Sequence, residues 1–276
     1  MNIKIKSGKL FKFILLIVFI LAVLYPTVWI LRMSFQRHVD AFSSTQKLFF
    51  KPILNNYLRL IKDSQFPSRF LNSFIEAGLS TFLALFIGIP AAYVFSRLQF
   101  KFKNILLVFI LSSRMIPPIS LLIPYFLVFN NIGLIDTRIG MILVYTVFNL
   151  GLVIWAMWSF FDDIPKEMDE AAEVDGASVI QTLYKVIVPV STAGITSIAI
   201  LCFVMAWNDF IFALMLTRSR AVTAPIELAS KALAYQSEDI TLVAAGCIIV
   251  AAPAIIFTVI LRKYLQKGLL AGAVKG

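Results

Sequence analysis

Cysteine and histidine are scarce in this chain, which narrows the chemistry that it can perform. It has two cysteines and one histidine among 276 residues. Cys202 and Cys247 lie within long apolar runs, where a packing role is favoured over a disulfide, a metal ligand or a nucleophile. His38 stands alone in a polar stretch, and no cluster of cysteine and histidine occurs. The sequence therefore argues against a metal site and against a membrane-embedded enzyme.

Charged residues are also few. They make up 14% of the chain and hydrophobic residues 60%, with a mean hydropathy of +0.89. A soluble domain carries about 25% charged residues. The apolar residues fall in blocks near the roughly 20 residues with which a helix crosses a bilayer. The net charge of +10 comes from basic residues at the block ends, where they set membrane orientation rather than bind nucleic acid. We therefore predict an all-α polytopic membrane protein with one membrane domain and no nucleic-acid partner.

Six blocks are long enough to be transmembrane helices, and they cover residues 11–33, 69–95, 105–129, 139–161, 192–216 and 240–261. The third contains Pro117 and Pro118, which break a continuous helix, so this span should be kinked or interrupted. The short basic segments at the N-terminus, after Arg97 and at the C-terminus carry no acids, which predicts that both termini are cytoplasmic. No internal repeat suggests the inverted halves of a secondary transporter.

A strongly acidic stretch stands between the fourth and fifth predicted spans, and we call residues 162–190 the acidic segment. Its acids are Asp162, Asp163, Glu167, Asp169, Glu170, Glu173 and Asp175. Basic residues are expected on the cytoplasmic side of a membrane, so this sign is unusual there. Small residues stand among the acids and would let another surface approach closely. A docking site for a partner protein is therefore our hypothesis, and an ordinary solvated loop is the alternative.

The acidic segment is predicted to fold as a helix, a tight turn and a second helix. Pro165 suits a first helical turn, and Asp162 and Asp163 could cap it. Gly176 should end this helix, because glycine accepts the positive φ of a helix end. The second helix is amphipathic. Its apolar face consists of Ile180, Leu183 and Ile187.

The acidic segment resembles the EAA loop, the cytoplasmic signature of binding-protein-dependent ABC importer permeases. The matching residues are Glu170, Ala171, Ala172, Asp175, Gly176, Ala177 and Pro189. Over about residues 69–276 the chain is similar to the carbohydrate-importer, maltose-permease-like branch. The further motifs are Asn72-Ser73, Ala91-Ala92-Tyr93, Ser96-Arg97, Arg114-Met115-Ile116-Pro117-Pro118, Gly133-Leu134-Ile135-Asp136-Thr137, Phe160-Phe161, Ile164-Pro165, Trp207-Asn208, Phe210, Gly268-Leu269 and Ala271-Gly272-Ala273-Val274-Lys275-Gly276.

The resemblance implies a type I ABC importer transmembrane domain and a division of the chain into three parts. Residues 1–68 would hold an N-terminal cytoplasmic tail, the first transmembrane helix and an outer loop. Residues 69–265 would form the permease core with five transmembrane helices and the EAA loop at 162–190. Residues 266–276 would be a C-terminal cytoplasmic tail, whose end, 271–276, should reach the ATPase subunits.

The resemblance also implies a function, which is ATP-driven import of a carbohydrate (oligosaccharide, disaccharide or polyol) across the bacterial cytoplasmic (inner) membrane by alternating access. The expected partners are membrane lipid, a second homologous permease subunit, two ATPase subunits and an extracytoplasmic solute-binding protein. The sequence itself lacks the phosphate-binding pattern G-x-x-x-x-G-K-[ST]. We therefore expect no enzyme activity and no cofactor in this chain, with ATP and Mg on the partner ATPase subunits.

The resemblance assigns ATPase coupling to Glu170, Ala171, Ala172, Asp175, Gly176 and Ala177. We expect Glu170 to make a charge-assisted contact with a basic residue of the ATPase. Asp175 either makes such a contact or caps the second helix. Gly176 is structural, because a side chain there would strain the turn by roughly 1 kcal/mol or more. The three alanines would let the loop seat closely against its partner.

Polar residues inside the predicted spans are further candidates, because a charged residue at mid-span costs about 2.5–3.5 kcal/mol on insertion. The substrate pathway is predicted to include Tyr93, Arg114, Asn149, Asn208 and Asp209. Hydrogen bonding between helices would explain Tyr93, Asn149, Asn208 and Asp209 at least equally well. For Arg114 we favour a structural or gating role, through pairing with Asp209 or Glu76, over direct binding.

A different class of function is kept as an alternative. Glu76, Arg114 and Asp209 could form the relay of a gradient-coupled secondary transporter. Such a protein would transport without an ATPase, so uptake into vesicles with and without ATP separates the two hypotheses.

Overall fold

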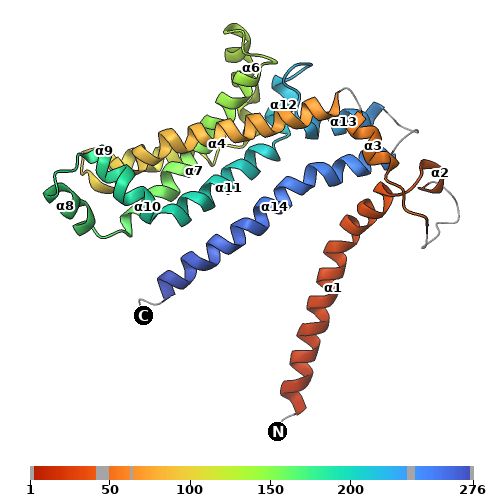
Figure 1. Cartoon of the computed structure of the whole chain (residues 1–276), viewed down its shortest axis with the longest axis horizontal. Coiled ribbons are helices and arrows are strands. Elements are labelled where there is room, and N and C mark those ends of the chain that lie inside the picture. The colour runs from red at the N-terminus through yellow and green to blue at the C-terminus, as the bar shows by residue number, and fades with distance from the viewer. Residues whose placement is uncertain (1–2, 42–49, 63–64, 235–239, 274–276) are drawn as a thin grey trace. The chain divides into compact units, whose positions relative to one another are not determined.

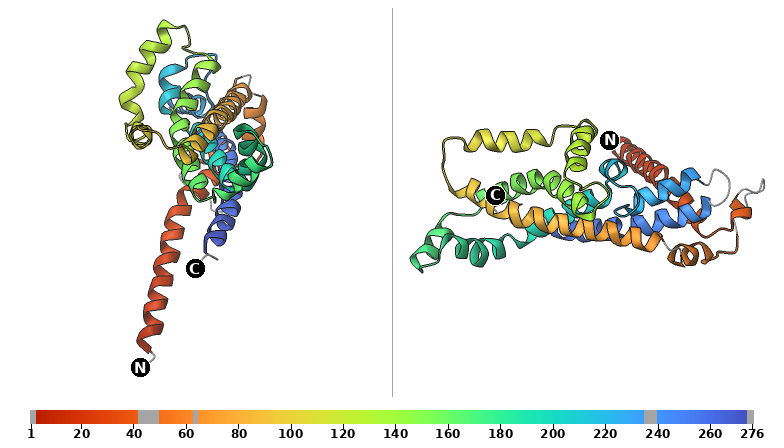
Figure 2. Two further views of the ribbon diagram at one scale, coloured as in Figure 1. Left: turned by 90° about the vertical axis from the view of Figure 1, so that its left-hand side faces the viewer. Right: turned by 90° about the horizontal axis from the view of Figure 1, so that it is seen from above.

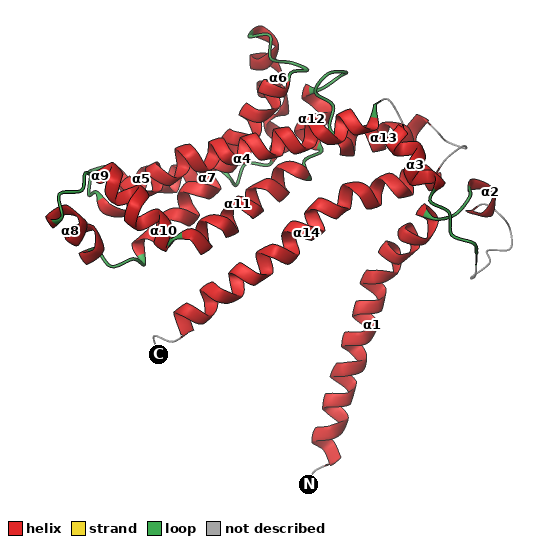
Figure 3. Cartoon of the chain, in the orientation of Figure 1, coloured by secondary structure: helices red, strands yellow, loops and turns green. Residues whose placement is uncertain are grey.

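The computed structural model describes residues 3–41, 50–62, 65–234 and 240–273, with side chains except at 3–8, 234 and 263–273. These residues form helices joined by turns, and none of them belongs to a strand (Figure 3). The chain divides into two compact units. The first contains Met1–Pro67 and Leu228–Ala251, and the second contains Ser68–Glu227 and Ala252–Gly276.

The first unit begins with a long apolar helix, α1, over Ile3–Ser34. Its large apolar side chains from Leu10 to Leu31 are mostly exposed, as expected of a helix that faces lipid. Two short helices follow, α2 over His38–Ala41 and α3 over Asn55–Lys62. The buried amide of Asn56 in α3 donates hydrogen bonds of 2.9 Å to the carbonyls of Ser34 and Gln36 and so fastens α3 to the end of α1.

The second unit holds most of the remaining helices. They are α4 (Phe66–Arg97), α5 (Lys103–Ser113), α6 (Pro118–Asn131), α7 (Arg138–Asp162), α8 (Glu167–Val174), α9 (Val179–Thr182), the π-helical turn η1 (Leu183–Ile187), α10 (Val188–Val190), α11 (Thr192–Trp207) and α12 (Ile211–Leu216). α7 is central and packs against α5, α11 and α12. Helices α8 and α9 lie at one end of α4 and α7, and α6 and α12 lie towards the other (Figure 1). α4 begins in the first unit, with Phe66 and Pro67, and two further helices, α13 (Ala224–Ala234) and α14 (Ile240–Ala273), also contribute to both units.

The described residues contain four helices long and apolar enough to cross a membrane: Lys9–Ser34, Phe66–Arg97, Arg138–Asp162 and Ile240–Arg262. Two bent pairs of helices raise the number to six if each pair is one span. In the first pair, α5 and α6 meet at 95° (Figure 2). Pro117 is the N-cap of α6 and Pro118 its first residue, which confirms the predicted interruption.

The fifth predicted span, residues 192–216, is not one continuous helix. α11 ends at Trp207 and α12 begins at Ile211. The cause is Asp209, whose carboxylate accepts hydrogen bonds from the backbone N–H of Phe212 at 3.5 Å and Ala213 at 3.1 Å and so starts a new helix. The second bent pair lies before this break, where Val179–Val190 meets Thr192–Trp207 at 82°.

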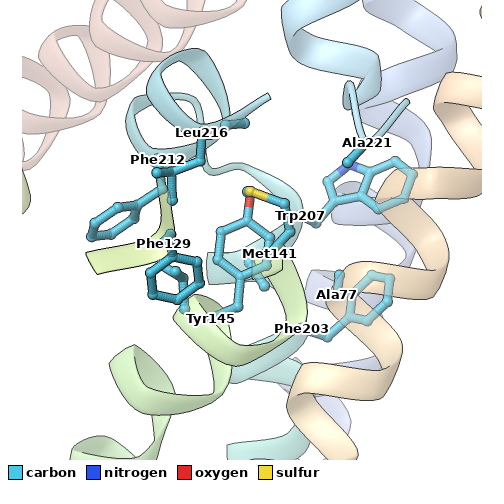
Figure 4. Close-up of a cluster of buried hydrophobic side chains, with 12 residues drawn as sticks. Ala77, Phe129, Met141, Tyr145, Phe203, Trp207, Phe212, Leu216 and Ala221 are labelled. Carbon is cyan, nitrogen blue, oxygen red and sulfur yellow. The ribbon is translucent and has the colours of Figure 1, made fainter. Parts of the chain in front are cut away.

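The two largest groups of buried side chains in the second unit hold its helices together. The larger one is rich in aromatic rings from several helices (Figure 4). Its buried members are Ala77, Phe129, Met141, Val144, Tyr145, Phe203, Ala206, Trp207, Phe212, Ala213, Leu216 and Ala221. The rings of Phe203 and Trp207 stack, and Phe70 meets Trp207 edge to face. The second group joins α4, α7, η1 and α11 at the end that carries the acidic segment.

Candidate functional site

The acidic segment begins with α8, whose start differs from the prediction. The N-cap residue Lys166 provides no side-chain cap. Asp162 is the last residue of α7 and Asp163 is its C-cap, so the prediction that these two acids cap the next helix is wrong. The physical reason is that α7 continues beyond the apolar run from which its end was predicted.

The turn after α8 closes at Gly176, which has the predicted positive φ, of 78°. The N–H of Gly176 donates to the carbonyl of Glu173 and the N–H of Ala177 donates to the carbonyl of Ala172, both at 2.9 Å. These two bonds form a Schellman motif, which satisfies carbonyl groups at the helix end. The turn therefore has a defined backbone geometry.

The second helix starts at α9 with a cap that the sequence prediction missed. The Ser178 hydroxyl accepts a hydrogen bond from the N–H of Gln181, and the Gln181 side chain accepts one from the N–H of Ser178. This capping box means that Asp175 does not cap the helix. Its sequence signal, serine followed three residues later by glutamine, was available.

The apolar face of this second helix is buried only in part. Leu183 and Ile187 are 4% and 0% exposed and pack in the group shared by α4, α7 and α11. Ile180, which was predicted to share this apolar face, is 69% exposed. It lies in the first turn of α9, beside the exposed turn, and the buried face begins one turn later.

Most of the acids predicted to dock a partner face outward. Six of the seven are exposed, and Asp169 is the exception. Exposed apolar side chains stand beside them, with Val174 89% exposed and Val179 exposed as well. Carboxylates and apolar groups therefore share one exposed turn at the end of the second unit.

The six residues predicted to couple to an ATPase all lie on α8 and its turn. Glu170, Ala171, Asp175 and Gly176 are exposed. Ala172 is buried and Ala177 is half-buried. Glu170 makes no ion pair with any other residue whose side chain the structure describes. Its carboxylate is therefore available to a partner.

Asp169 points into its own unit, where it meets α4. Its Oδ1 accepts a hydrogen bond of 2.5 Å from the Tyr93 hydroxyl, and its Oδ2 accepts one of 2.9 Å from Arg97 Nε. Tyr93 was predicted to line a substrate pathway, and the structure places it at the α8 end of α4. Asp169 is separated from Tyr93 by 76 positions in the sequence and from Arg97 by 72. No local sequence signal connects residues so far apart, so this contact was not predicted.

Arg114 lies at the corner between α5 and α6, and it does not pair with an acid. Its guanidinium donates a hydrogen bond to the carbonyl of Phe148 and lies over the Phe148 ring, 4.7 Å from the centroid. Its Nη2 is 3.6 Å from Met205 Sδ. The hypothesis that Arg114 pairs with Glu76 or Asp209 is wrong, because a carbonyl and an aromatic face hold the cation instead.

The remaining pathway candidates have separate surroundings. Asn149 is buried, and its amide donates to the carbonyl of Cys202 at 3.2 Å, which joins α7 to α11. Asn208 is exposed at the end of α11. Asp209 accepts a hydrogen bond of 3.0 Å from the Tyr145 hydroxyl. For Asn149 the contact is the hydrogen bond between helices that was its alternative explanation.

Glu76 of α4 is fully buried, and neither carboxylate oxygen has a hydrogen-bond partner among the described residues. Arg138 and Asp209 are the nearby charges that act on it. Because Arg114 is held elsewhere, the three residues of the hypothetical relay do not form a connected set. Within the described ranges, no group of three or more histidine, cysteine, aspartate or glutamate side chains could hold a metal ion.

A second set of contacts lies at the opposite end of the unit. Asp136, in the turn before α7, binds the loop at residues 218–221, and we call this arrangement the Asp136 clasp. Its donors are the backbone N–H groups of Arg218, Ser219, Arg220 and Ala221 and the hydroxyl of Ser219, at 2.8–3.2 Å. The amide of Asn72 donates to the carbonyls of Arg220 and Val222 in the same loop, at 2.9 Å.

The environment of Asp136 favours its charged form. Partial burial acts to raise the pKa of this carboxyl. The hydrogen bonds from the N–H groups of Arg218, Ser219 and Ala221 and from the Ser219 hydroxyl outweigh burial and hold the pKa well below its usual range. The clasp is therefore a charge-assisted contact that fixes the loop.

Comparisons with known proteins agree with this architecture. Residues 84–270 match a protein family described as "Binding-protein-dependent transport system inner membrane component". The trehalose transport system permease protein of Mycobacterium tuberculosis is 37% identical over 255 residues, which cover 92% of this chain and 93% of that protein. The trehalose/maltose transport system permease protein of Thermococcus litoralis is 35% identical over 256 residues, 92% of each chain.

A third relative and a solved structure complete the comparison. The sulfoquinovosyl glycerol transport system permease protein of Agrobacterium fabrum is 32% identical and covers 98% of this chain and 95% of its own. A chain from the crystal structure of a bacterial ABC transporter involved in the import of the acidic polysaccharide alginate shares the fold. Its TM-score is 0.84 at 23% identity, with 96% of this chain and 98% of that chain covered.

The family match extends over the acidic segment and most of the second unit, and three permease proteins match nearly the whole chain at more than 30% identity. Membership of a binding-protein-dependent system argues against the gradient-coupled alternative. The chain belongs to the family of inner membrane components of binding-protein-dependent transport systems and is a transport subunit, not an enzyme.

Proposed function

We propose that this chain is a permease subunit of an ATP-driven importer that carries an oligosaccharide, disaccharide or polyol across the bacterial cytoplasmic membrane. The substrate class is supported by the relatives, whose names specify trehalose, trehalose or maltose, and sulfoquinovosyl glycerol. These three are glycosides or sugars with many hydroxyl groups. The permease works with a second permease subunit, two ATPase subunits that bind ATP and Mg, and a solute-binding protein.

The exposed turn of the acidic segment carries this proposal. It combines free carboxylates with the exposed side chains of Val174 and Ile180 on a connection whose backbone is fixed by the Schellman motif and the Ser178 cap. A surface of this composition fits a partner that offers a basic residue to Glu170 and an apolar hollow to the valine and isoleucine. We assign that partner as the ATPase, which puts this end of the unit in the cytoplasm.

Coupling through this turn explains why a chain without a nucleotide-binding sequence can use ATP. Closure of the ATPase pair moves the docked turn, and the helices packed on it follow. α9, η1 and α10 continue from the turn to the 82° bend, after which α11 enters the bundle. Movement at the turn therefore has a short covalent route to α11.

We assign the substrate route from the polar groups that could bind sugar hydroxyls. Asn208 is an exposed amide at the helix break, and Asp209 lies next to it with Tyr145. Amide and carboxylate groups of this kind suit sugar hydroxyls. Arg114, Asn149 and Tyr93 are already engaged by the protein, so we propose for them roles in holding the bundle. Asp209 is engaged as well, by Tyr145 and by the start of α12, which leaves Asn208 as the exposed group proposed to meet the solute.

Uptake into lipid vesicles tests the function directly. The four-subunit complex is reconstituted with its solute-binding protein, and a panel of labelled disaccharides, oligosaccharides and polyols is offered. Import of a panel member with ATP inside, and none with an ion or proton gradient alone, is the expected result. Gradient-driven uptake without ATP would overturn the proposal, and ATP-driven uptake confined to a non-carbohydrate solute would overturn the substrate class.

A further inference from the structure

Asp169 differs from every other acid of the acidic segment. The other six acids are exposed, whereas the Asp169 side chain is 17% exposed. It also takes part in an ion pair, with Arg97 of α4, whose side chain is 10% exposed. An acid with its carboxylate turned towards its own subunit is not placed to bind an external partner. We therefore infer its role from the residues that it binds.

Both oxygens of Asp169 are used, and each binds a different residue of α4. The Tyr93 hydroxyl donates to Oδ1 at 2.5 Å and Arg97 Nε donates to Oδ2 at 2.9 Å. Tyr93 and Arg97 are four residues apart, so they lie on one face of α4, one turn from each other. Hydrogen bonds to an ionised carboxylate that is shielded from solvent are among the stronger ones in proteins.

Arg97 extends the contact to the start of the acidic segment. Its Nη1 donates to the carbonyl of Phe161 at 2.9 Å and its Nη2 donates to the carbonyl of Ile164 at 3.2 Å. One guanidinium therefore holds the end of α7, the connection to α8 and α8 itself. The last turn of α4 becomes the point at which these three segments are joined.

No other side-chain hydrogen bond or ion pair connects α8 to α4 among the described residues. The remaining links of α8 are the short peptide connections before Glu167 and after Val174 and its contacts with α9 and η1. Those links join α8 to the helices that follow it rather than to α4. The two bonds of Asp169 fix its orientation against α4.

We propose that Asp169 is a positioning residue that makes α8 and α4 move together, through its bonds to Tyr93 and Arg97. The proposal rests on the function proposed above, in which the ATPase displaces α8. We call the bonds of Asp169 to Tyr93 and Arg97 the Asp169 joint. Movement of the turn then reaches the bundle by two routes: along the chain into α11, and through the Asp169 joint into α4. Loss of the joint leaves docking intact and removes one route.

Distance measurements in the assembled complex test the joint itself. Spin labels are placed at two exposed positions, Glu173 on α8 and Leu98 just after α4, in the full complex reconstituted in lipid. The unaltered joint should give a narrow distance distribution, and Asp169→Ala should give a broad one. A distribution that stays narrow in Asp169→Ala would overturn the proposal. The distance distribution does not depend on transport, so it tests the joint even if the proposed function is wrong.

The ratio of solute imported to ATP hydrolysed tests whether the joint transmits movement. We expect Asp169→Ala to co-purify with the ATPase subunits as the unaltered chain does. Its ratio should fall about tenfold, the factor that corresponds to about 1.4 kcal/mol of coupling. Asp169→Glu, which keeps two acceptor oxygens, should restore part of the ratio. An unchanged ratio in Asp169→Ala with a broadened distance distribution would show that the joint transmits nothing.

Two further variants keep the test decisive if Asp169→Ala fails to assemble. Tyr93→Phe removes one hydroxyl and leaves the Arg97 ion pair, so the chain should fold and the ratio should fall by about threefold. In the double variant Tyr93→Phe/Asp169→Asn, the ratio should fall by less than the two single changes together predict, because both changes act on one joint. Tyr25→Phe, which removes the hydroxyl of an exposed tyrosine on α1, is the matched control and should leave the ratio unchanged. Equal ratios in Tyr93→Phe and Tyr25→Phe would overturn the proposal.

Discussion

Asp136 binds the backbone N–H of Arg218 at 2.8 Å, although the two residues are 82 positions apart in the sequence. The contact is the first of the bonds that make the Asp136 clasp. Asp136 has a φ of 58°, in the left-handed region, where aspartate and asparagine are tolerated better than most residues. This conformation lets one short side chain reach several successive N–H groups of the loop.

The clasp predicts the effect of Asp136→Asn. The amide tolerates the same φ and can accept at one oxygen, but it loses the charge and turns an NH₂ group towards N–H donors. Amide hydrogens of residues 218–221 should therefore exchange roughly tenfold faster or more, since local opening becomes easier. Hydrogen exchange followed by mass spectrometry measures this, with Asp163→Asn, an exposed acid in the acidic segment, as the control. Unchanged protection would mean that the charge of Asp136 does not hold the loop.

The clasp also predicts how the loop responds to pH. The folded-state pKa of Asp136 is depressed, so its stabilising contribution is complete above the unfolded value of about 3.9 and is lost only as the pH falls through the folded value. Protection of residues 218–221, corrected for the intrinsic exchange rate, should therefore be the same at pH 8 and at pH 5. A loss of protection within that window would contradict a depressed pKa.

Glu170→Lys should impair the communication with the ATPase without affecting insertion into the membrane. The side chain is exposed and makes no ion pair within the described part of the chain, so the change disturbs little in the permease itself. A lysine opposite a basic ATPase residue would repel it, and solute-stimulated ATP hydrolysis should fall by about tenfold or more. Asp163→Lys reverses a charge on the same segment, away from the turn, and should retain most of the activity. Normal stimulated hydrolysis in Glu170→Lys would remove Glu170 from the docking contact.

Gly176 offers a way to perturb the turn through its backbone alone. An added Cβ would meet no atom within 4 Å, so the cost of Gly176→Ala comes from its φ of 78°. That cost is about 1–2 kcal/mol. We expect reduced solute-stimulated ATP hydrolysis for Gly176→Ala and a smaller reduction for Gly176→Asn, because asparagine visits this region more readily. Gly78 also has open space but no positive φ, so Gly78→Ala should not reduce activity. Equal activity of all three variants would show that the turn does not need its conformation.

Local signals predicted the features that depend on neighbouring residues. Apolar run length indicated the spans, the Pro117-Pro118 pair indicated the break, and Gly176 indicated the turn, because each constraint acts within a few residues. The break at Asn208 could have been found as well. Asp209 stands where a helix-capping acid is expected, and the apolar residues around it concealed that signal.

Contacts between distant segments were not predictable from the same signals. The Asp136 clasp and the Asp169 joint each depend on which helices the fold brings together, and single sequences do not contain that information in a local pattern. The same limit explains why the predicted acidic partner of Arg114 was wrong. Its position in an apolar run suggested an acidic partner, but the fold provides the Phe148 carbonyl and ring, which satisfy the cation without one.

Arg114 should therefore matter more for stability than for substrate recognition. Lysine at this position keeps the charge but cannot lie flat on the Phe148 ring and donate to its carbonyl together. Gly151 packs against the side chain, where an added Cβ would lie 3.3 Å from Arg114 Cγ and from the carbonyl of Ile110, so this corner is tightly filled. We expect Arg114→Lys to cost about 1–2 kcal/mol and to lower the melting temperature of the purified complex by several degrees. The KM for the transported solute should stay within about twofold. Arg138→Lys is the control at a second arginine, in the first turn of α7, since Arg138 donates to Asn72 rather than lying on a ring. A raised KM without a change in melting temperature would instead place Arg114 in the substrate route.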